Sequence, residues 1–196
     1  MSEVSAALSQ CRVAAEQWAH AERAGSIISQ PSPLGRGCPS GDGRVRGNLI
    51  QAPIKKIVMQ KYKTESVSVS LDAYIDDDGS LNMEGQDIGD SVEKYWGDSD
   101  YEHFLYVKKE DKEKIPLLLL KERFASMTDF LKWLDEKGLP AAPGDTAPDF
   151  ETHLNTHLDY QDTILLFLLK EQFTTMSDFM AWLNERKIAK EFGSWA

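Results

Sequence analysis

Apolar and polar residues alternate along the chain between residues 66 and 75. The apolar positions are Val67, Val69, Leu71, Ala73 and Ile75. A period of two is typical of a β-strand with one buried face. Residues 76–79 then predict a hairpin turn closed by a glycine with positive φ, and the alternation resumes over residues 80–84. The pattern therefore predicts two antiparallel strands joined by a tight turn.

A third strand is predicted over residues 101–107, which are dense in aromatic side chains. Before it, Asp90 and Glu93 have the spacing of a helix-capping pair, and the short helix that they open would end at Gly97. A meander of three strands needs helices on one face, and helical patterns follow at once. We therefore expect an α+β fold in which helices pack on a three-stranded antiparallel meander.

One helical segment occurs twice. Residues 115–139 (copy one) and residues 164–188 (copy two) align at a constant offset of 49, and 13 of 25 positions are identical. Each copy predicts a helix, a tight turn and a second helix, which together form a helical hairpin. The second helix carries an apolar face at positions i, i+3 and i+4. Its residues are Phe130, Trp133 and Leu134 in copy one, and Phe179, Trp182 and Leu183 in copy two.

The two copies compete for a sheet face that has room for roughly one helical hairpin. We expect copy two to occupy it, because copy two leads directly into the aromatic ending at residues 192–195. Copy one would then either pack on copy two or join two chains into a homodimer. The 11-residue linker from Gly138 to Pro148 is long enough for both arrangements.

Residues 1–58 differ in composition from the rest of the chain. Residues 5–23 are rich in alanine with a thin apolar face, and residues 29–47 are rich in Gly, Pro, Ser and Arg without a periodic pattern. We therefore expect residues 1–58 to be a disordered or weakly helical leader and residues 59–196 to form the folded domain. A further interpretation is that the leader is a translated intergenic segment and that Met59 is the biological start.

The formal net charge of −10 is unevenly distributed. Residues 1–58 hold seven Lys/Arg against four Asp/Glu, a balance of +3, whereas residues 59–196 hold 15 against 28, a balance of −13. An acidic surface repels nucleic acids and anionic membranes, so it favours a basic protein partner. The chain shows neither a bilayer-length apolar stretch nor a signal-peptide pattern at its start, and we expect a cytoplasmic protein.

The sequence carries no recognisable catalytic or cofactor motif: neither a nucleophile elbow, nor a P-loop, nor a dinucleotide fingerprint is present. Both cysteines precede residue 59, so the predicted domain has no thiolate site. Residues 76–78 are three aspartates, but an EF-hand loop with Gly79 at its sixth position would begin on Tyr74 and end on Gly85. We therefore expect no enzyme activity and no cofactor.

His153 and His157 lie one helical turn apart, a spacing that can hold a metal ion. Leu154 replaces the glutamate that a metalloprotease motif would place after the first histidine. We interpret the pair as solvated histidines near the start of a helix. A metal-dependent hydrolase that uses His153 and His157 is the alternative function.

The strongest candidate for a binding site is a cluster of aromatic residues among carboxylates, which suits recognition of a basic protein segment. The candidate binding residues are Tyr95, Trp96, Asp98, Asp100, Tyr101, Glu102, His103 and Tyr106, and Phe104 belongs to the same aromatic cluster. The competing interpretation is a strand and a tight turn whose aromatic residues serve the core, because half of any strand faces inward.

From Tyr62 onward the chain resembles a widespread kind of small acidic bacterial protein of unknown function. The segments that carry the resemblance are residues 67–75, 77–81, 84–89, 97–102 and 192–195, with the leucine-rich helix. In that pattern a single helical hairpin runs into the aromatic ending, which implies that copy one is the inserted copy. The resemblance implies no activity. We predict a non-enzymatic protein-interaction module, such as an immunity, anti-defence or regulatory protein.

Overall fold

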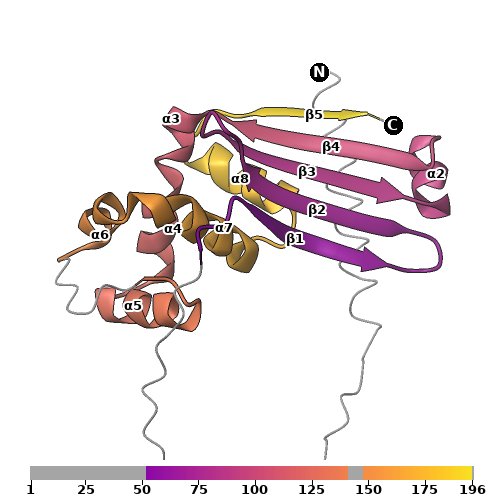
Figure 1. Ribbon diagram of the computed structural model, residues 1–196. Coiled ribbons are helices and arrows are strands. Elements are labelled where there is room, and N and C mark those ends of the chain that lie inside the picture. Colours follow the sequence, from indigo (N-terminus) through magenta and orange to yellow (C-terminus); the bar gives the residue numbers. More distant parts are fainter. Residues whose placement is uncertain (1–51, 141–147, 196) are drawn as a thin grey trace, which may run out of the picture. The chain divides into compact units, whose positions relative to one another are not determined.

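The computed structural model describes residues 52–140 and 148–195 (Figure 1). All of them belong to the part of the chain from Arg46 to Ala196. The elements in chain order are β1 (Lys56–Lys63), β2 (Ser68–Ile75), β3 (Leu81–Ile88), α2 (Asp90–Trp96), β4 (Asp100–Val107), α3 (Lys109–Lys112), α4 (Ile115–Arg123), α5 (Met127–Glu136), α6 (Phe150–Thr156), the 3-10 helix η1 (Leu158–Tyr160), α7 (Gln161–Gln172), α8 (Met176–Glu185) and β5 (Glu191–Trp195). The fold mixes helices with one antiparallel sheet, as the sequence predicted.

The sheet has five strands in the order β1-β2-β3-β4-β5, and all neighbours are antiparallel. The predicted three-stranded meander corresponds to β2, β3 and β4, so the predicted number of strands is wrong. β1 was not predicted because its register with β2 shifts between Val58 and Gln60, which breaks the period-two pattern. β5 was not predicted because it has only five residues, too few for an alternating pattern to be recognised.

The predicted leader lies outside the described residues as far as residue 51. For residues 56–58 the prediction is wrong, because they form the start of β1. Ile57 is buried in the core there. Just before the strand, the Ile54 N–H donates a hydrogen bond to Thr163 Oγ1 of α7 at 2.9 Å. The folded part of the chain therefore begins before Met59.

Glycines close the two tight turns as predicted. Gly79 has φ 85° between β2 and β3, and Gly97 has φ 83° at the end of α2, and both values lie in the region that favours glycine. The start of α2 differs from the prediction. Gly89 holds the capping position and Asp90 is the first helical residue, without a side-chain cap. The capping prediction placed the helix one residue too late.

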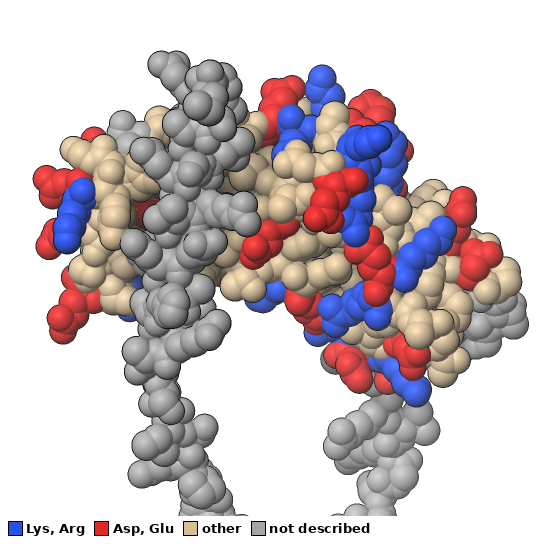
Figure 2. Space-filling model, turned by 180° about the vertical axis from the view of Figure 1, so that it is seen from behind, with Lys and Arg blue, Asp and Glu red and all other residues tan. Residues whose placement is uncertain are grey.

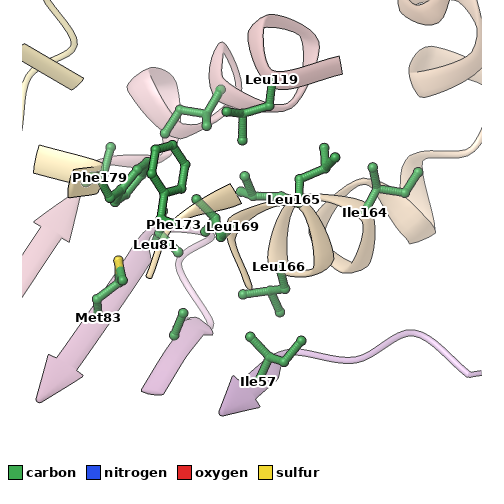
Figure 3. Packing of buried hydrophobic residues seen from close by; sticks show 14 of the residues in the cluster. Ile57, Leu81, Met83, Leu119, Ile164, Leu165, Leu166, Leu169, Phe173 and Phe179 are labelled. Carbon is green, nitrogen blue, oxygen red and sulfur yellow. The ribbon is translucent and has the colours of Figure 1, made fainter. Parts of the chain in front are cut away.

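The helices of the two hairpins lie on one side of the sheet, which we call the inner face, while the opposite outer face carries no described helix (Figure 1). α7 lies between the sheet and α4. Figure 3 shows Leu166 of α7 directed toward Ile57 of β1, and Leu165 directed toward Leu119 of α4. These side chains are buried, and each contributes about 1.5–3 kcal/mol by leaving water. The α7 helix is therefore apolar around most of its circumference.

The two copies pack on each other through reciprocal hydrogen bonds. Trp133 Nε1 of copy one donates to Glu171 Oε2 of copy two at 2.9 Å. Trp182 Nε1 of copy two donates to Glu122 Oε2 of copy one at 2.8 Å. Trp133 aligns with Trp182 and Glu122 aligns with Glu171 in the sequence repeat, so the two hairpins are related by an approximate two-fold axis.

The same reciprocity holds for the cations around each glutamate. Lys137 forms an ion pair with Glu171, and its counterpart Arg186 forms one with Glu122. Arg123 adds a second cation to Glu171 at 2.5 Å.

Copy one therefore packs on copy two within one chain, as the first of the two predicted arrangements has it, with Trp133 against Phe167 of α7. Phe130 of the same apolar stripe packs against Phe150 and His153 of α6. The homodimer stays a prediction.

Charges of both signs are interspersed over the helical side of the molecule, which Figure 2 shows from behind. Within residues 52–140 and 148–195, no helix has the length and apolar character needed to cross a membrane.

Candidate functional site

Strand alternation divides the predicted site between the two faces of the sheet. In β4, Leu105 and Val107 are buried against the helices, so Tyr101 and His103 share their inner face. The even-numbered residues Asp100, Glu102 and Tyr106 lie on the outer face. Tyr95 and Trp96 lie on α2, and Asp98 lies in the turn after it. The eight residues therefore do not form one surface.

The outer face collects aromatic and acidic side chains from four strands. We call this surface the acidic aromatic face. It consists of Tyr74 on β2, Glu84 on β3, Asp100, Glu102, Phe104 and Tyr106 on β4, and Trp195 on β5. The ring centroids of Phe104 and Trp195 are 5.1 Å apart, and Trp195 Nε1 donates a hydrogen bond to Glu102.

The carboxylates of this face are held by neutral donors. Gln86 Nε2 lies 3.1 Å from Asp100 Oδ1 and 3.4 Å from Glu102 Oε1. The Tyr74 hydroxyl donates to Glu84 Oε1 at 2.5 Å. Within the described part of the chain, no Lys or Arg forms an ion pair with Glu84, Asp100 or Glu102. Their negative charge is therefore available to a cation from outside.

The pKa of the Tyr74 hydroxyl is raised by burial and by the carboxylates of this face. Burial raises it, the hydrogen bond to Glu84 and the charge of that carboxylate raise it further, and the pKa of the Tyr74 hydroxyl reaches about 12. Tyr74 therefore stays protonated at neutral pH and keeps donating to Glu84. Lys56 lies at the far side of the face, where its Nζ pairs with Asp72 at 2.7 Å and sits 5.9 Å from the Tyr74 ring centroid.

The inner-face residues form a stack of rings instead of an acidic surface. Trp96 stacks on Tyr101 with centroids 4.5 Å apart and planes at 5°, and Tyr101 stacks on His103 at 5.5 Å. The His103 ring fills the space where a side chain at Gly85 would stand, so only glycine fits at that point of β3. These rings pack on one another and do not belong to the hydrophobic core, so the competing interpretation, in which they serve the core, does not describe them.

Two titratable groups occur here: His103, which belongs to the stack, and Asp87, which stands opposite Tyr101 in the sheet register. Asp87 Oδ1 and His103 Nδ1 are buried and have no hydrogen-bond partner among the described residues. Burial raises the pKa of the Asp87 carboxyl to about 6 and lowers the pKa of His103. His103 is therefore neutral at pH 7, and it adds no positive charge to this end of the sheet.

The structure does not favour a metal site at the histidine pair. His153 is fully buried, contrary to the prediction of solvated histidines, because its ring packs edge-on against Phe130 with centroids 5.1 Å apart. The His157 ring stacks on His153 at 4.4 Å with planes at 23°, so the two rings lie face to face. In residues 52–140 and 148–195, no group of three or more His, Cys, Asp or Glu side chains is arranged to hold a metal ion.

Sequence reasoning missed three members of the acidic aromatic face: Tyr74, Glu84 and Trp195. Tyr74 and Glu84 stand at outward positions of two strands that were predicted, so the registration of these strands would have placed them together. Trp195 required β5, which pairs with β4 across 93 positions in sequence. Its sequence shows no periodic signal, because the two large residues of the closing segment, Phe192 and Trp195, are three positions apart and lie on opposite faces.

No family model matches the chain, and neither a curated protein nor a solved structure matches it. The resemblance to small bacterial proteins therefore stays a prediction, and the function has to be argued from the geometry of the site.

Proposed function

We propose that this protein is a non-enzymatic interaction module that binds a basic segment of another protein on its acidic aromatic face. The observation that carries the proposal is the combination of open aromatic rings with carboxylates that lack a cation. Trp195 is 57% exposed, and Glu102 beside it pairs with neutral donors among the described residues. A module of this kind acts by occupying its partner, as an immunity, anti-defence or regulatory protein does.

The chemistry of the face fits Lys and Arg side chains in two ways. A guanidinium or ammonium group can pair with Glu84, Asp100 or Glu102, and its alkyl stem can lie on an aromatic ring. A cation over the face of Trp195 or Tyr106 gains about 0.5–2 kcal/mol from the ring quadrupole. The balance of −13 over residues 59–196 attracts the same partner from a distance.

The proposal is tested by the double substitution Glu84→Gln with Glu102→Gln. Glutamine keeps an acceptor for the Tyr74 hydroxyl and for Trp195 Nε1, so the fold is preserved while two charges are removed. Each exposed pair contributes about 0.5–1 kcal/mol, so binding of the tightest members of an arrayed library of basic octapeptides should weaken about tenfold. Fluorescence anisotropy at constant ionic strength measures the change.

The matched control removes two charges from the helical side, with Glu110→Gln and Glu136→Gln. Both residues are exposed on α3 and α5. This variant should bind the same peptides within about twofold of the parent, because only long-range attraction is reduced. An equal loss in both variants would show a general charge effect, and the acidic aromatic face would not be the binding site.

A further inference from the structure

The two edges of the sheet differ in how they are protected against pairing. β1 carries Lys56, Lys61 and Lys63 and a register shift between Val58 and Gln60, and lysines and bulges are the usual means of blocking an edge. β5 has none of these devices. Residues 191–195 contain no lysine and no proline, and their register with β4 is regular over all five pairs.

The side of β5 away from β4 is therefore a regular run of backbone donors and acceptors about 16 Å long. β5 is the last strand in the sheet order, and β4 is its only strand neighbour among the described residues. Such an edge is the template on which an extended peptide adds a further strand.

The side chains along this edge specify what an added strand would need. On the outer face, Trp195 and Glu191 alternate along β5, and the Phe104 ring lies over Gly193, so the acidic aromatic face continues across β5. On the inner face, Phe192 is 43% exposed. An added strand would place every second side chain beside the carboxylates and rings, and the others beside Phe192.

We infer that the free edge of β5 binds an extended partner segment in which basic residues alternate with apolar residues, and that this segment joins the sheet as a sixth strand. The inference rests on the proposed function, since it names the way in which the basic partner is recognised. A second copy of this chain is the less favourable occupant, because residues 59–196 of each copy carry a charge balance of −13 and would repel each other.

The probe is a capped heptapeptide that alternates lysine and valine, titrated into the full chain. Two derivatives carry N-methyl groups, one on the valine amides and one on the lysine amides, so each blocks one edge of the extended peptide and leaves charge and composition nearly unchanged. A block peptide with the lysines together and the valines together is the composition control.

We expect one N-methylated derivative to bind at least tenfold more weakly than the parent peptide while the other stays within about threefold. The block peptide should bind like the weaker derivative. Hydrogen exchange should slow at amides of residues 191–195 on addition of the parent peptide. If both derivatives bind as tightly as the parent, or both lose affinity alike, edge pairing is excluded and the proposed function still stands. If no basic peptide binds at all, the proposed function fails and this inference with it.

A variant of the protein gives an independent reading. Phe192→Lys places on β5 the kind of residue that guards β1, and it should weaken binding of the alternating peptide at least tenfold. Phe192→Leu, the matched control, should bind within about threefold of the parent. Both variants should unfold at a temperature close to that of the parent, because Phe192 is half exposed. Equal binding by Phe192→Lys and Phe192→Leu would contradict the inference.

Discussion

Copy one and copy two are identical at 13 of 25 positions, yet they lie in different layers of the molecule. α7 of copy two packs on β1 and β2 as well as on α4, whereas α4 of copy one packs on α7, α6 and α3. The residues that the two copies share therefore form the hairpin within each copy and the contact between the copies. The shared residues do not decide which copy meets the sheet, because the same residue type is fully buried at Leu166 of α7 and only partly buried at Leu117 of α4.

The largest difference between the copies should appear at Leu166 and its counterpart Leu117. Leu166 is fully buried against the sheet, and Leu117 is only partly buried. Leu166→Ala should lower the free energy of unfolding by about 3–4 kcal/mol through lost burial and a cavity, and Leu117→Ala by about 1 kcal/mol. Urea denaturation of both variants measures the difference. Equal losses would mean that the two copies share the sheet face.

A smaller and symmetric effect is expected at the tryptophans, because each donates one hydrogen bond across the copies. Trp133→Phe and Trp182→Phe keep most of the ring and remove the Nε1 donor to Glu171 or Glu122. Each change should lower the free energy of unfolding by about 1–2 kcal/mol, and the two values should agree within about 0.5 kcal/mol. The two tryptophans have matching ring neighbours, which supports equal losses. The ring centroids of Phe130 and Trp133 lie 6.1 Å apart, and those of Phe179 and Trp182 lie 6.0 Å apart. A difference above about 1 kcal/mol would show that the two-fold relation does not extend to the energetics.

The smallest expected effect is a pH dependence of stability at Glu171 of copy two. Burial raises the pKa of the Glu171 carboxyl, but hydrogen bonds from Lys137 and Trp133 and the charge of Arg123 outweigh it, so the pKa lies below its ordinary value. A lowered pKa stabilises the fold at pH above the ordinary value of about 4.3, and this contribution is lost as pH falls through the lowered pKa. Glu171→Gln should therefore be less stable than the parent at pH 7, and the gap should close as pH falls through the lowered pKa of Glu171.

Melting temperatures across pH 3–7 measure this gap, with Asp159→Asn, an exposed carboxylate on the 3-10 helix, as the control. The control removes a carboxylate that forms no ion pair among the described residues, so it separates a general effect of lost charge from the effect at Glu171. A Glu171→Gln gap that is the same at pH 3 and pH 7 would mean that lost packing, and not lost charge, accounts for the change.

The parts of the fold that could be predicted from the sequence are those with a local signal. The period of two in β2, the glycines at positions 79 and 97, and the repeated apolar faces around Trp133 and Trp182 all depend on neighbours in the chain. β1 and β5 depend on distant partners: the Lys-rich sequence of β1 becomes a strand only beside β2, and β5 only beside β4. The strand conformation of β1 and β5 depends on pairing with a neighbouring strand, so a local sequence pattern could not predict it.

The candidate site was predicted in composition and not in geometry. Asp100, Glu102 and Tyr106 do share a face with further aromatic and acidic residues, whereas Tyr101 and His103 point to the other side. A cluster of residues that are close in sequence does not show which face of the sheet each residue occupies, because neighbours in a strand lie on opposite faces. His153 shows the same limit, since only the packing of Phe130 on its ring reveals that it is buried.

The strand order has a consequence for the order in which the protein is made. β1 to β4 follow one another closely along the chain, but residues 108–190 separate β4 from β5. At synthesis rates of 5–20 residues per second, the ribosome needs roughly 4–17 s to reach β5 after β4 has emerged. During that interval the edge of β4, with Phe104 and Tyr106 beside it, has no strand to pair with. A nascent chain of this protein therefore carries an unpaired β4 edge for seconds, and such an edge is a template for pairing with another chain until β5 arrives.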